Sequence, residues 1–191
     1  LTPRRGSVGA VLDGIDLRIV DDTGDDVLVG DAGELWVRGP NVFAGYLDDP
    51  DATERVVTAD GWLRTGDIGR LDDDGFLYIV DRKKDMILSG SQNIYPADIE
   101  AVMRDHPAVA DVAVVGVPSE RWGETPLALV VAAAGCEAPE AGVLVEWTNQ
   151  RVGRQQRLAG AVYVADLPRN PNGKILKREL RKQYADWEKA R

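Results

Sequence analysis

Three charged residues, far apart in the sequence, have the types and settings that chemistry on a nucleotide or a carboxylate requires. Asp67 follows Thr65-Gly66 at a predicted strand edge, where its carboxylate can accept hydrogen bonds from two hydroxyls such as those of a ribose. Arg82 offers a rigid fork of donors for hydroxyl or phosphate oxygens. Lys174 ends a predicted tight turn that projects its ammonium toward charge developing on a phosphoryl or carboxylate oxygen. Taken singly, each residue also fits an ordinary role: a turn-capping aspartate, a solvated hinge arginine and an exposed lysine.

The sequence lacks the residue patterns of a nucleophilic triad, a phosphate-binding loop and a metal site. The single histidine, His106, precedes a proline at a predicted helix end with no serine or cysteine motif nearby, so no nucleophilic triad is indicated. The sequence has no GxxxxGK[ST] phosphate loop and no histidine or cysteine spacing typical of a metal site, so no metal ligand is predicted. Anion chemistry must therefore use lysine, arginine and loop amides.

The 191 residues carry a formal net charge of −9, but the charge is unevenly placed. Residues 1–75 hold 7 basic and 17 acidic side chains, residues 76–191 hold 16 and 15, and residues 170–191 hold 7 and 3. An anionic ligand would therefore be met by local cations rather than by the overall field. No large basic face with interleaved aromatic residues is present, so we predict no nucleic-acid partner.

The sequence also bears on location. No apolar run approaches the roughly 20 residues that a membrane helix requires, so we predict no membrane span. The one cysteine, Cys136, excludes an internal disulfide and is typical of a reducing compartment. The start at Leu1 lacks a methionine and a secretory pattern, which we interpret as a cut within a longer protein. We predict a cytoplasmic location; no oligomeric state is predicted.

The order of the predicted elements indicates an α+β fold. Short apolar runs separated by glycine, aspartate and proline turns predict strands within 8–20, 34–38, 68–71 and 76–80. Later the pattern changes to helices, predicted at 97–105, 139–152 and 176–190, alternating with strands at 109–117, 127–133 and 162–164. A β-rich unit is therefore followed by a compact α+β unit.

The stretch from Gly75 to Glu100 joins these two units. It runs from an alternating strand through four charged residues, 81–84, into a second apolar segment, a polar loop at 89–93 and a helix. A charged joint between two apolar segments is the pattern expected where one folded unit ends and another begins. We therefore predict domains at residues 1–81 and 82–191.

Four motifs in this order resemble those of the AMP-forming acyl-CoA synthetases, the adenylate-forming family of acyl-CoA ligases, luciferases and peptide-synthetase adenylation domains. They are GELxxxG with GYL at 33–39 and 45–47, WxxTGD at 62–67, the hinge and following loop at 81–100, and NGK at 172–174. Together they cover almost the whole chain.

The resemblance implies an enzyme that joins a carboxylate to ATP, giving acyl-AMP and pyrophosphate, and then passes the acyl group to the thiol of CoA. Residues 1–81 would be the last subdomain of a large domain, a distorted β-barrel, and residues 82–191 would be the whole small domain, which swivels between the two steps. The family's phosphate loop, its Mg²⁺-binding segment and its acyl pocket would precede Leu1. We therefore expect this C-terminal fragment alone not to adenylate.

The resemblance also implies residue roles. Asp67 and Arg82 would hold the ribose hydroxyls, and Asn93 would face the nucleotide. Lys174 would be the catalytic residue, in contact with the carboxylate and α-phosphate oxygens. Lys84, two residues after the arginine, stands at the family's hinge position and would absorb the backbone rotation.

The loop Ser89-Gly90-Ser91 would line the tunnel for the pantetheine arm of CoA. Here the sequence departs from the family's common SGGENIYP, because Ser91 replaces the second glycine and Gln92 replaces glutamate. A Cβ at residue 91 would narrow a close backbone approach.

The segment 86–96 looks more like acyl-CoA ligases than peptide-synthetase modules, which favours a fatty or similarly apolar acid as substrate. Two alternatives stay open. One is an adenylation enzyme that loads a carrier protein, although the chain ends soon after Lys174 rather than continuing into a carrier. The other is a non-catalytic binding module that keeps the fold, although a scaffold would have no need of Asp67, Arg82 and Lys174 together.

Overall fold

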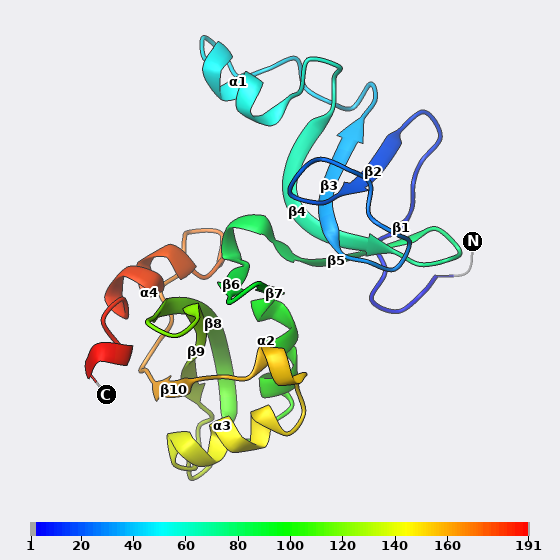
Figure 1. Ribbon diagram of the computed structural model, residues 1–191. Helices are drawn as coiled ribbons and strands as arrows, with labels where there is room; N and C mark the ends of the chain where they lie inside the picture. The colour runs from blue at the N-terminus through cyan, green and yellow to red at the C-terminus, as the bar shows by residue number, and fades with distance from the viewer. Residues whose placement is uncertain (1–2, 191) are drawn as a thin grey trace. The chain divides into compact units, whose positions relative to one another are not determined.

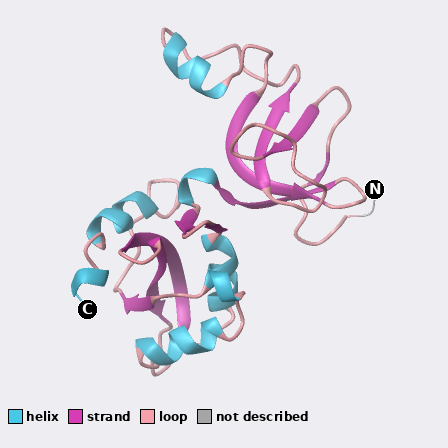
Figure 2. Ribbon diagram, viewed as in Figure 1, coloured by secondary structure: helices cyan, strands magenta, loops and turns pink. Residues whose placement is uncertain are grey.

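The structure is a computed structural model that describes residues 3–190. The chain divides into two compact units, Leu1–Lys84 and Asp85–Arg191, and each is described by itself (Figure 1). Strands predominate in the first unit, and helices accompany strands in the second (Figure 2). The α+β class predicted from the sequence is confirmed. The assignment of 1–81 and 82–191 as domains stays a prediction; the compact units meet three residues later than that predicted boundary.

The first unit is built on one antiparallel sheet of five strands in the order β1-β5-β4-β3-β2. Its strands are β1 (Gly9–Ala10), β2 (Asp16–Val20), β3 (Gly33–Arg38), β4 (Leu63–Leu71) and β5 (Phe76–Arg82). The sheet is open, with β1 and β2 as its edge strands, whereas the resemblance implied a distorted barrel. A short helix, α1 (Pro50–Val56), lies between β3 and β4 in the sequence and begins with a proline after the capping residue Asp49.

Close backbone approach shapes this sheet around β4. A Cβ added to Gly69 would lie 2.8 Å from the carbonyl oxygen of Tyr78 and 3.0 Å from the Leu35 side chain, so the strands can come this near only at a glycine. The pairing of β4 with β5 shifts register between Ile68 and Gly69. Two residues from Gly69, in the middle of β4, Asp67 stands opposite Arg82.

The second unit is a mainly antiparallel sheet with helices on both faces. Its strands are β6 (Ile87–Ser89), β7 (Gln92–Ile94), β8 (Val109–Ser119), β9 (Gly123–Ala132) and β10 (Gly160–Tyr163). Its helices are α2 (Pro96–Arg104), α3 (Ala141–Asn149) and α4 (Lys177–Gln183), with single 3₁₀ turns η1 (Lys83–Asp85, across the unit boundary), η2 (Arg154–Gln156) and η3 (Glu188–Ala190). Strand β9 pairs with β8 and with β6 antiparallel and with β10 parallel. In the part of the chain that the structure describes, no helix is long and apolar enough to cross a membrane.

The hairpin of β8 and β9 is buried on both faces. Val112 and Val114 lie in one apolar cluster with residues of α2 and α3, whereas Val115 and Val117 lie in a second cluster with Leu180 of α4. Burial on both faces accounts for the nearly continuous apolar run that predicted this strand. The predicted helices and strands of this unit are confirmed to within a few residues, except at the C-terminus.

The helix predicted at 176–190 is shorter than expected. Helix α4 ends at Gln183, because Tyr184 leaves helical geometry (φ −108°, ψ 17°), and η3 follows separately. Tyr184 and Trp187 nevertheless pack against the second apolar cluster, as their spacing predicted. Breaking the helix lets Trp187 reach β10, where its indole would lie 2.4 Å from a Cβ added to Gly160.

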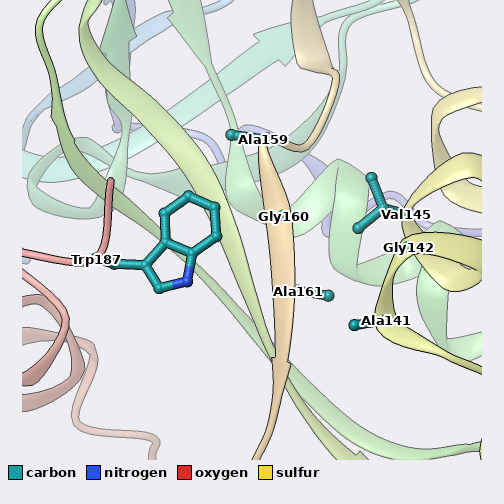
Figure 3. A pocket seen from close by; sticks show the side chains of 7 residues that line it. All are labelled: Ala141, Gly142, Val145, Ala159, Gly160, Ala161 and Trp187. Atoms are coloured by element: carbon teal, nitrogen blue, oxygen red, sulfur yellow. The ribbon is translucent and has the colours of Figure 1, made fainter. Parts of the chain in front are cut away.

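Trp187 and the start of α3 line an apolar pocket of about 390 Å³ beside β10 (Figure 3). Two glycines of this pocket differ in what surrounds them. Gly160 is buried under the Trp187 indole, whereas a Cβ on Gly142, in the first turn of α3, would meet nothing within 4 Å. The pair allows a matched test of whether Trp187 closes onto the strand.

We expect Gly160→Ala to lower the free energy of unfolding by about 1–3 kcal/mol, because the rigid indole must move away from a new methyl group. Gly142→Ala should be neutral or stabilising by up to about 1 kcal/mol, since alanine is the better helix former. Urea unfolding followed by circular dichroism measures both. Equal effects of the two substitutions would show that Trp187 does not pack on Gly160.

Candidate functional site

Asp67 and Arg82 face each other across β4 and β5. They are register partners, and the Arg82 Nε lies 2.7 Å from the Asp67 Oδ1. The Arg82 side chain is 51% exposed and that of Asp67 is 28% exposed, so a ligand from solvent could reach both. The structure thus brings together two residues that sequence analysis selected separately, in a geometry that presents an acceptor beside a donor.

The backbone around Asp67 is held by β3. Gly66 adopts φ +70°, a left-handed conformation that favours glycine, and its N–H donates to Glu34 Oε1 at 3.2 Å. The Thr65 hydroxyl donates to the Leu35 carbonyl at 2.9 Å and accepts from the Asp67 N–H at 3.1 Å. The Thr-Gly-Asp sequence therefore forms a fixed turn that displays the Asp67 carboxylate.

Glu34 is a buried carboxylate that sequence analysis noted only as part of a motif. Its Oε2 lies 3.1 Å from the Lys83 Nζ, and Lys83 is also 3.3 Å from Asp22. Burial acts to lower the pKa of the Lys83 ammonium, but the hydrogen bond and charge of Glu34, with those of Asp22, outweigh burial and raise that pKa above its ordinary value. The side chain next to Arg82 in sequence is thereby anchored to β3.

Lys174 follows a tight turn, as predicted. The Asn170 Oδ1 accepts the N–H groups of Asn172 at 3.0 Å and of Lys174 at 2.9 Å, and Arg169 bridges to Ile175 across the turn. The turn exposes Lys174. Within residues 3–190 its ammonium has no ion-pair partner, so the charge is available to a ligand.

In the loop Ser89-Gly90-Ser91, Ser89 is the last residue of β6, and Gly90 and Ser91 form the two-residue turn to β7. Gly90 adopts φ +63° and donates its N–H to the Trp122 carbonyl at 2.7 Å. Ser89 is partly buried and Ser91 is exposed. Asn93 of β7, which pairs with Leu88 of β6, is also exposed.

A pocket of about 440 Å³ opens beside this loop. It is lined by Ser89, Gln92, the half-exposed Trp122 and three arginines, Arg121, Arg154 and Arg157. None of the three arginines has a carboxylate partner among the residues that the structure describes. The pocket therefore offers uncompensated positive charge and an aromatic face next to the predicted pantetheine loop.

Sequence analysis missed the three arginines because they come from two separate loops. The run Arg151-Val152-Gly153-Arg154-Gln155-Gln156-Arg157 was the available signal, since it places repeated arginines around one short turn. Among the predicted site residues, Asp67, Arg82 and Lys84 belong to the first unit, whereas Ser89, Gly90, Ser91, Asn93 and Lys174 belong to the second. Lys84 is exposed within η1.

Comparison with known proteins identifies the family to which the chain is similar. The family model described as "AMP-binding enzyme" matches residues 1–47, and the model described as "AMP-binding enzyme C-terminal domain" matches residues 98–174. The chain is 43% identical over 176 residues to 2-succinylbenzoate–CoA ligase of Bacillus cereus, covering 92% of this chain and 36% of the relative. It is 43% identical over 182 residues to indoleacetate–CoA ligase of Aromatoleum aromaticum, covering 95% and 35%.

Solved structures give the same result. ATP-bound MatB from Rhodopseudomonas palustris matches with a TM-score of 0.88 and 36% identity, covering 95% of this chain and 36% of that one. The o-succinylbenzoate CoA synthetase (MenE) of Bacillus subtilis, in complex with its acyl-adenylate intermediate, matches with a TM-score of 0.83 and 38% identity, covering 92% and 35%. The fold is that of the C-terminal part of adenylate-forming enzymes.

The chain belongs to the AMP-binding, adenylate-forming acyl-CoA ligase family and corresponds to its C-terminal portion. It spans about a third of the length of the relatives that it matches.

The raised pKa of Lys83 predicts a pH-dependent contribution to stability. A group whose pKa is higher in the folded state stabilises fully below its unfolded-state pKa, about 10.4 for lysine, and loses that contribution as the pH rises through the folded-state value. We expect Lys83→Met to cost about 1–3 kcal/mol at pH 8, because it leaves the buried Glu34 carboxylate without its cation, and to cost less at pH 12, where the wild-type lysine is itself losing its charge. Urea unfolding at both pH values measures this, with Lys182→Met, an exposed lysine, as control. A cost that does not change with pH would contradict the prediction.

Proposed function

We propose that this chain is the C-terminal part of an acid–CoA ligase that forms an acyl-adenylate from ATP and a carboxylic acid and then makes the acyl-CoA thioester. In the first step a carboxylate oxygen attacks the α-phosphorus of ATP and pyrophosphate leaves. In the second step the CoA sulfur, having lost its proton, attacks the acyl carbon and AMP leaves. The family membership and the relatives named as CoA ligases support this proposal.

The observation that carries the adenylation step is the pairing of Asp67 with Arg82. A partly exposed carboxylate beside a partly exposed guanidinium can accept from ribose hydroxyls and donate to their oxygens at once. We assign these two residues, with Asn93, to nucleotide binding. Lys174, whose ammonium makes no ion pair among the described residues, is assigned to the carboxylate and α-phosphate oxygens, where its charge would stabilise the negative charge of the transition state.

The arginine-lined pocket supports CoA as the acceptor. CoA carries several phosphate charges and a nucleotide base, and the pocket supplies Arg121, Arg154, Arg157 and the Trp122 indole next to Ser89 and Gly90. Arginine guanidinium groups suit phosphate oxygens, and an exposed indole offers a stacking face. We therefore assign Ser89, Gly90 and Ser91 to the CoA arm and the arginines to its charged end.

Mg²⁺ is implied by the family. The described residues contain no group of three or more His, Cys, Asp or Glu side chains arranged to hold a metal ion, so no step is assigned to the ion here. Its ligands stay predicted in the part of the enzyme that precedes this chain.

The acid is proposed from the relatives. Two of them are named for 2-succinylbenzoate and indoleacetate, both ring-bearing acids. These names do not support the fatty acid predicted from segment 86–96, and we favour a ring-bearing carboxylic acid.

Other acceptors define the alternatives. A structure described as the amide bond synthetase McbA from Marinactinospora thermotolerans matches with a TM-score of 0.84 and 37% identity, so this fold also serves an enzyme named for amide bonds. A carrier protein presents one phosphate on its pantetheine arm, fewer than CoA, and would leave part of the arginine pocket unused. A non-catalytic module is disfavoured by the partly exposed Asp67–Arg82 pair together with a Lys174 ammonium that makes no ion pair among residues 3–190.

Lys84 is proposed as the hinge. Its neighbours are each tied to a different unit: Lys83 contacts Glu34 of the first unit, and Asp85 lies 3.1 Å from Arg181 of the second. Lys84 is exposed between them and makes no ion pair in the described part of the chain. Backbone rotation at this residue would disturb neither anchor.

In the full-length enzyme, we expect Lys174→Ala to reduce ATP–pyrophosphate exchange by about 10²- to 10³-fold, the loss typical of removing one charge-stabilising group. Thioester formation from preformed acyl-AMP and CoA should be retained. Exchange is measured for wild type and variant with a panel of acids that includes succinylbenzoate, indoleacetate and fatty acids. Exchange unaffected by the substitution would show that Lys174 is assigned wrongly, and no exchange by wild type with any acid would favour the non-catalytic alternative.

We expect Arg157→Gln to raise the KM for CoA about tenfold or more, since a hydrogen bond to a charged group is worth about 1.5–3 kcal/mol. The rate of ATP–pyrophosphate exchange should be unchanged, because the adenylation step that it measures does not involve CoA. Arg151→Gln, in the same segment but outside the pocket, is the control. A KM unchanged by Arg157→Gln, or raised equally by Arg151→Gln, would count against the CoA assignment.

A further inference from the structure

Glu100, in α2, is a buried carboxylate that joins three elements of the second unit. Its Oε1 accepts the N–H of Val114 in β8 at 2.8 Å and lies 2.7 Å from the Nζ of Lys177. Its Oε2 accepts from Arg104, one helical turn further along α2, at 3.2 Å. Both oxygens are therefore engaged, and the carboxylate fixes the start of α4 to α2 and to β8.

Lys177 is an unusual residue for its position. It is the first residue of α4, where the positive end of the helix dipole disfavours a cation. Its side chain is only 13% exposed, although lysine is rarely buried without a partner. Helix stability therefore does not account for Lys177, whereas its ion pair with Glu100 does.

The other side of the Lys174 turn is held in the same way. Arg169 forms an ion pair with Asp111 of β8 and donates its Nη1 to the Gly173 carbonyl at 2.6 Å. Between this anchor and Lys177 lie the turn and Lys174, whose backbone N–H is bound by Asn170. Of the three basic side chains, Arg169, Lys174 and Lys177, only Lys174 makes no ion pair within the part of the chain that the structure describes.

We propose that Glu100 and Lys177 are positioning residues that hold the Lys174 turn in place relative to α2 and β8 for the adenylation step. The inference rests on the proposed function, because it assigns these residues an effect through Lys174. A displacement of about 1 Å at a catalytic group can cost about 100-fold in rate, so a tether three residues from Lys174 can control the reaction without touching a substrate.

The variants must separate positioning from folding. Removing Lys177 alone leaves a buried charge on Glu100, which destabilises strongly, so the pair Glu100→Gln with Lys177→Met removes both charges together. Lys177→Arg keeps the charge and the tether. Lys182→Met makes the same lysine-to-methionine change at an exposed position of the same helix and is the matched control.

The experiment uses the full-length enzyme and measures ATP–pyrophosphate exchange, thioester formation from preformed acyl-AMP and CoA, and the melting temperature. We expect the charge-neutral pair to lower the kcat of exchange about 10- to 100-fold with little change in thioester formation. Lys177→Arg, which keeps the ion pair with Glu100, should retain most of the wild-type exchange activity, and Lys182→Met should behave as wild type. Combined with Lys174→Ala, the pair should cause little further loss, since residues that act through one group are not additive.

Two results would overturn this inference alone. One is an equal loss in both half-reactions that follows the melting temperature, which a merely structural role would give. The other is a full further loss in the Lys174→Ala background, which would show that the pair acts independently of Lys174. If Lys174→Ala itself leaves exchange intact, the assignment of Lys174 in the proposed function fails, and the inference fails with it.

Discussion

The second unit depends on the burial of both faces of the β8–β9 hairpin. Apolar side chains point to α2 and α3 on one face and to α4 on the other, so the hairpin cannot shift register without moving its whole apolar set. The site residues attach to this rigid element at three places. The Val114 N–H binds Glu100, whose ion pair with Lys177 holds the chain just after the Lys174 turn, and Asp111 pairs with Arg169 just before it. The Trp122 carbonyl at the hairpin end accepts the N–H of Gly90. Precise placement of exposed loops thus follows from a core that allows one register.

In the first unit the corresponding constraint is the close approach of β3 and β5 to Gly69 of β4. Gly69 has no room for a Cβ, and Asp67, two residues away, stands opposite Arg82. Gly66 supplies the left-handed turn that Glu34 caps. The buried Glu34 then holds Lys83 as well, so one carboxylate fixes the turn before Asp67 and the residue after Arg82. Two partly exposed ligand-binding candidates therefore rest on a buried charge that touches neither of them.

The sequence predicted the parts of this fold that follow from local pattern. The apolar run of β8, the helix after Tyr95-Pro96 and the turn before Lys174 all have periodicity or turn chemistry that is visible in one segment. Contacts between distant segments were not visible. The end of α4 was predicted too late because Trp187 packs on Gly160, and the arginine pocket was missed because its residues come from separate loops. Glu34 and Glu100 were missed for the same reason, since a charge buried by a distant partner has no periodic signal.

The residues on either side of Lys84 bear on its proposed role as the hinge. An ion pair between two exposed side chains is worth little. Each of these two pairs, however, contains a mostly buried carboxylate. The Glu34 partner of Lys83 is 9% exposed, and Asp85, the partner of Arg181, is 15% exposed. Breaking either pair would leave a carboxylate poorly solvated, so a rotation that spares both is the cheaper one. Lys84 is the residue between the two anchors, and its exposed side chain keeps its solvation as φ and ψ change. The charged segment that marked the junction in the sequence therefore ties each unit through its flanking charges, as the proposed hinge at Lys84 requires.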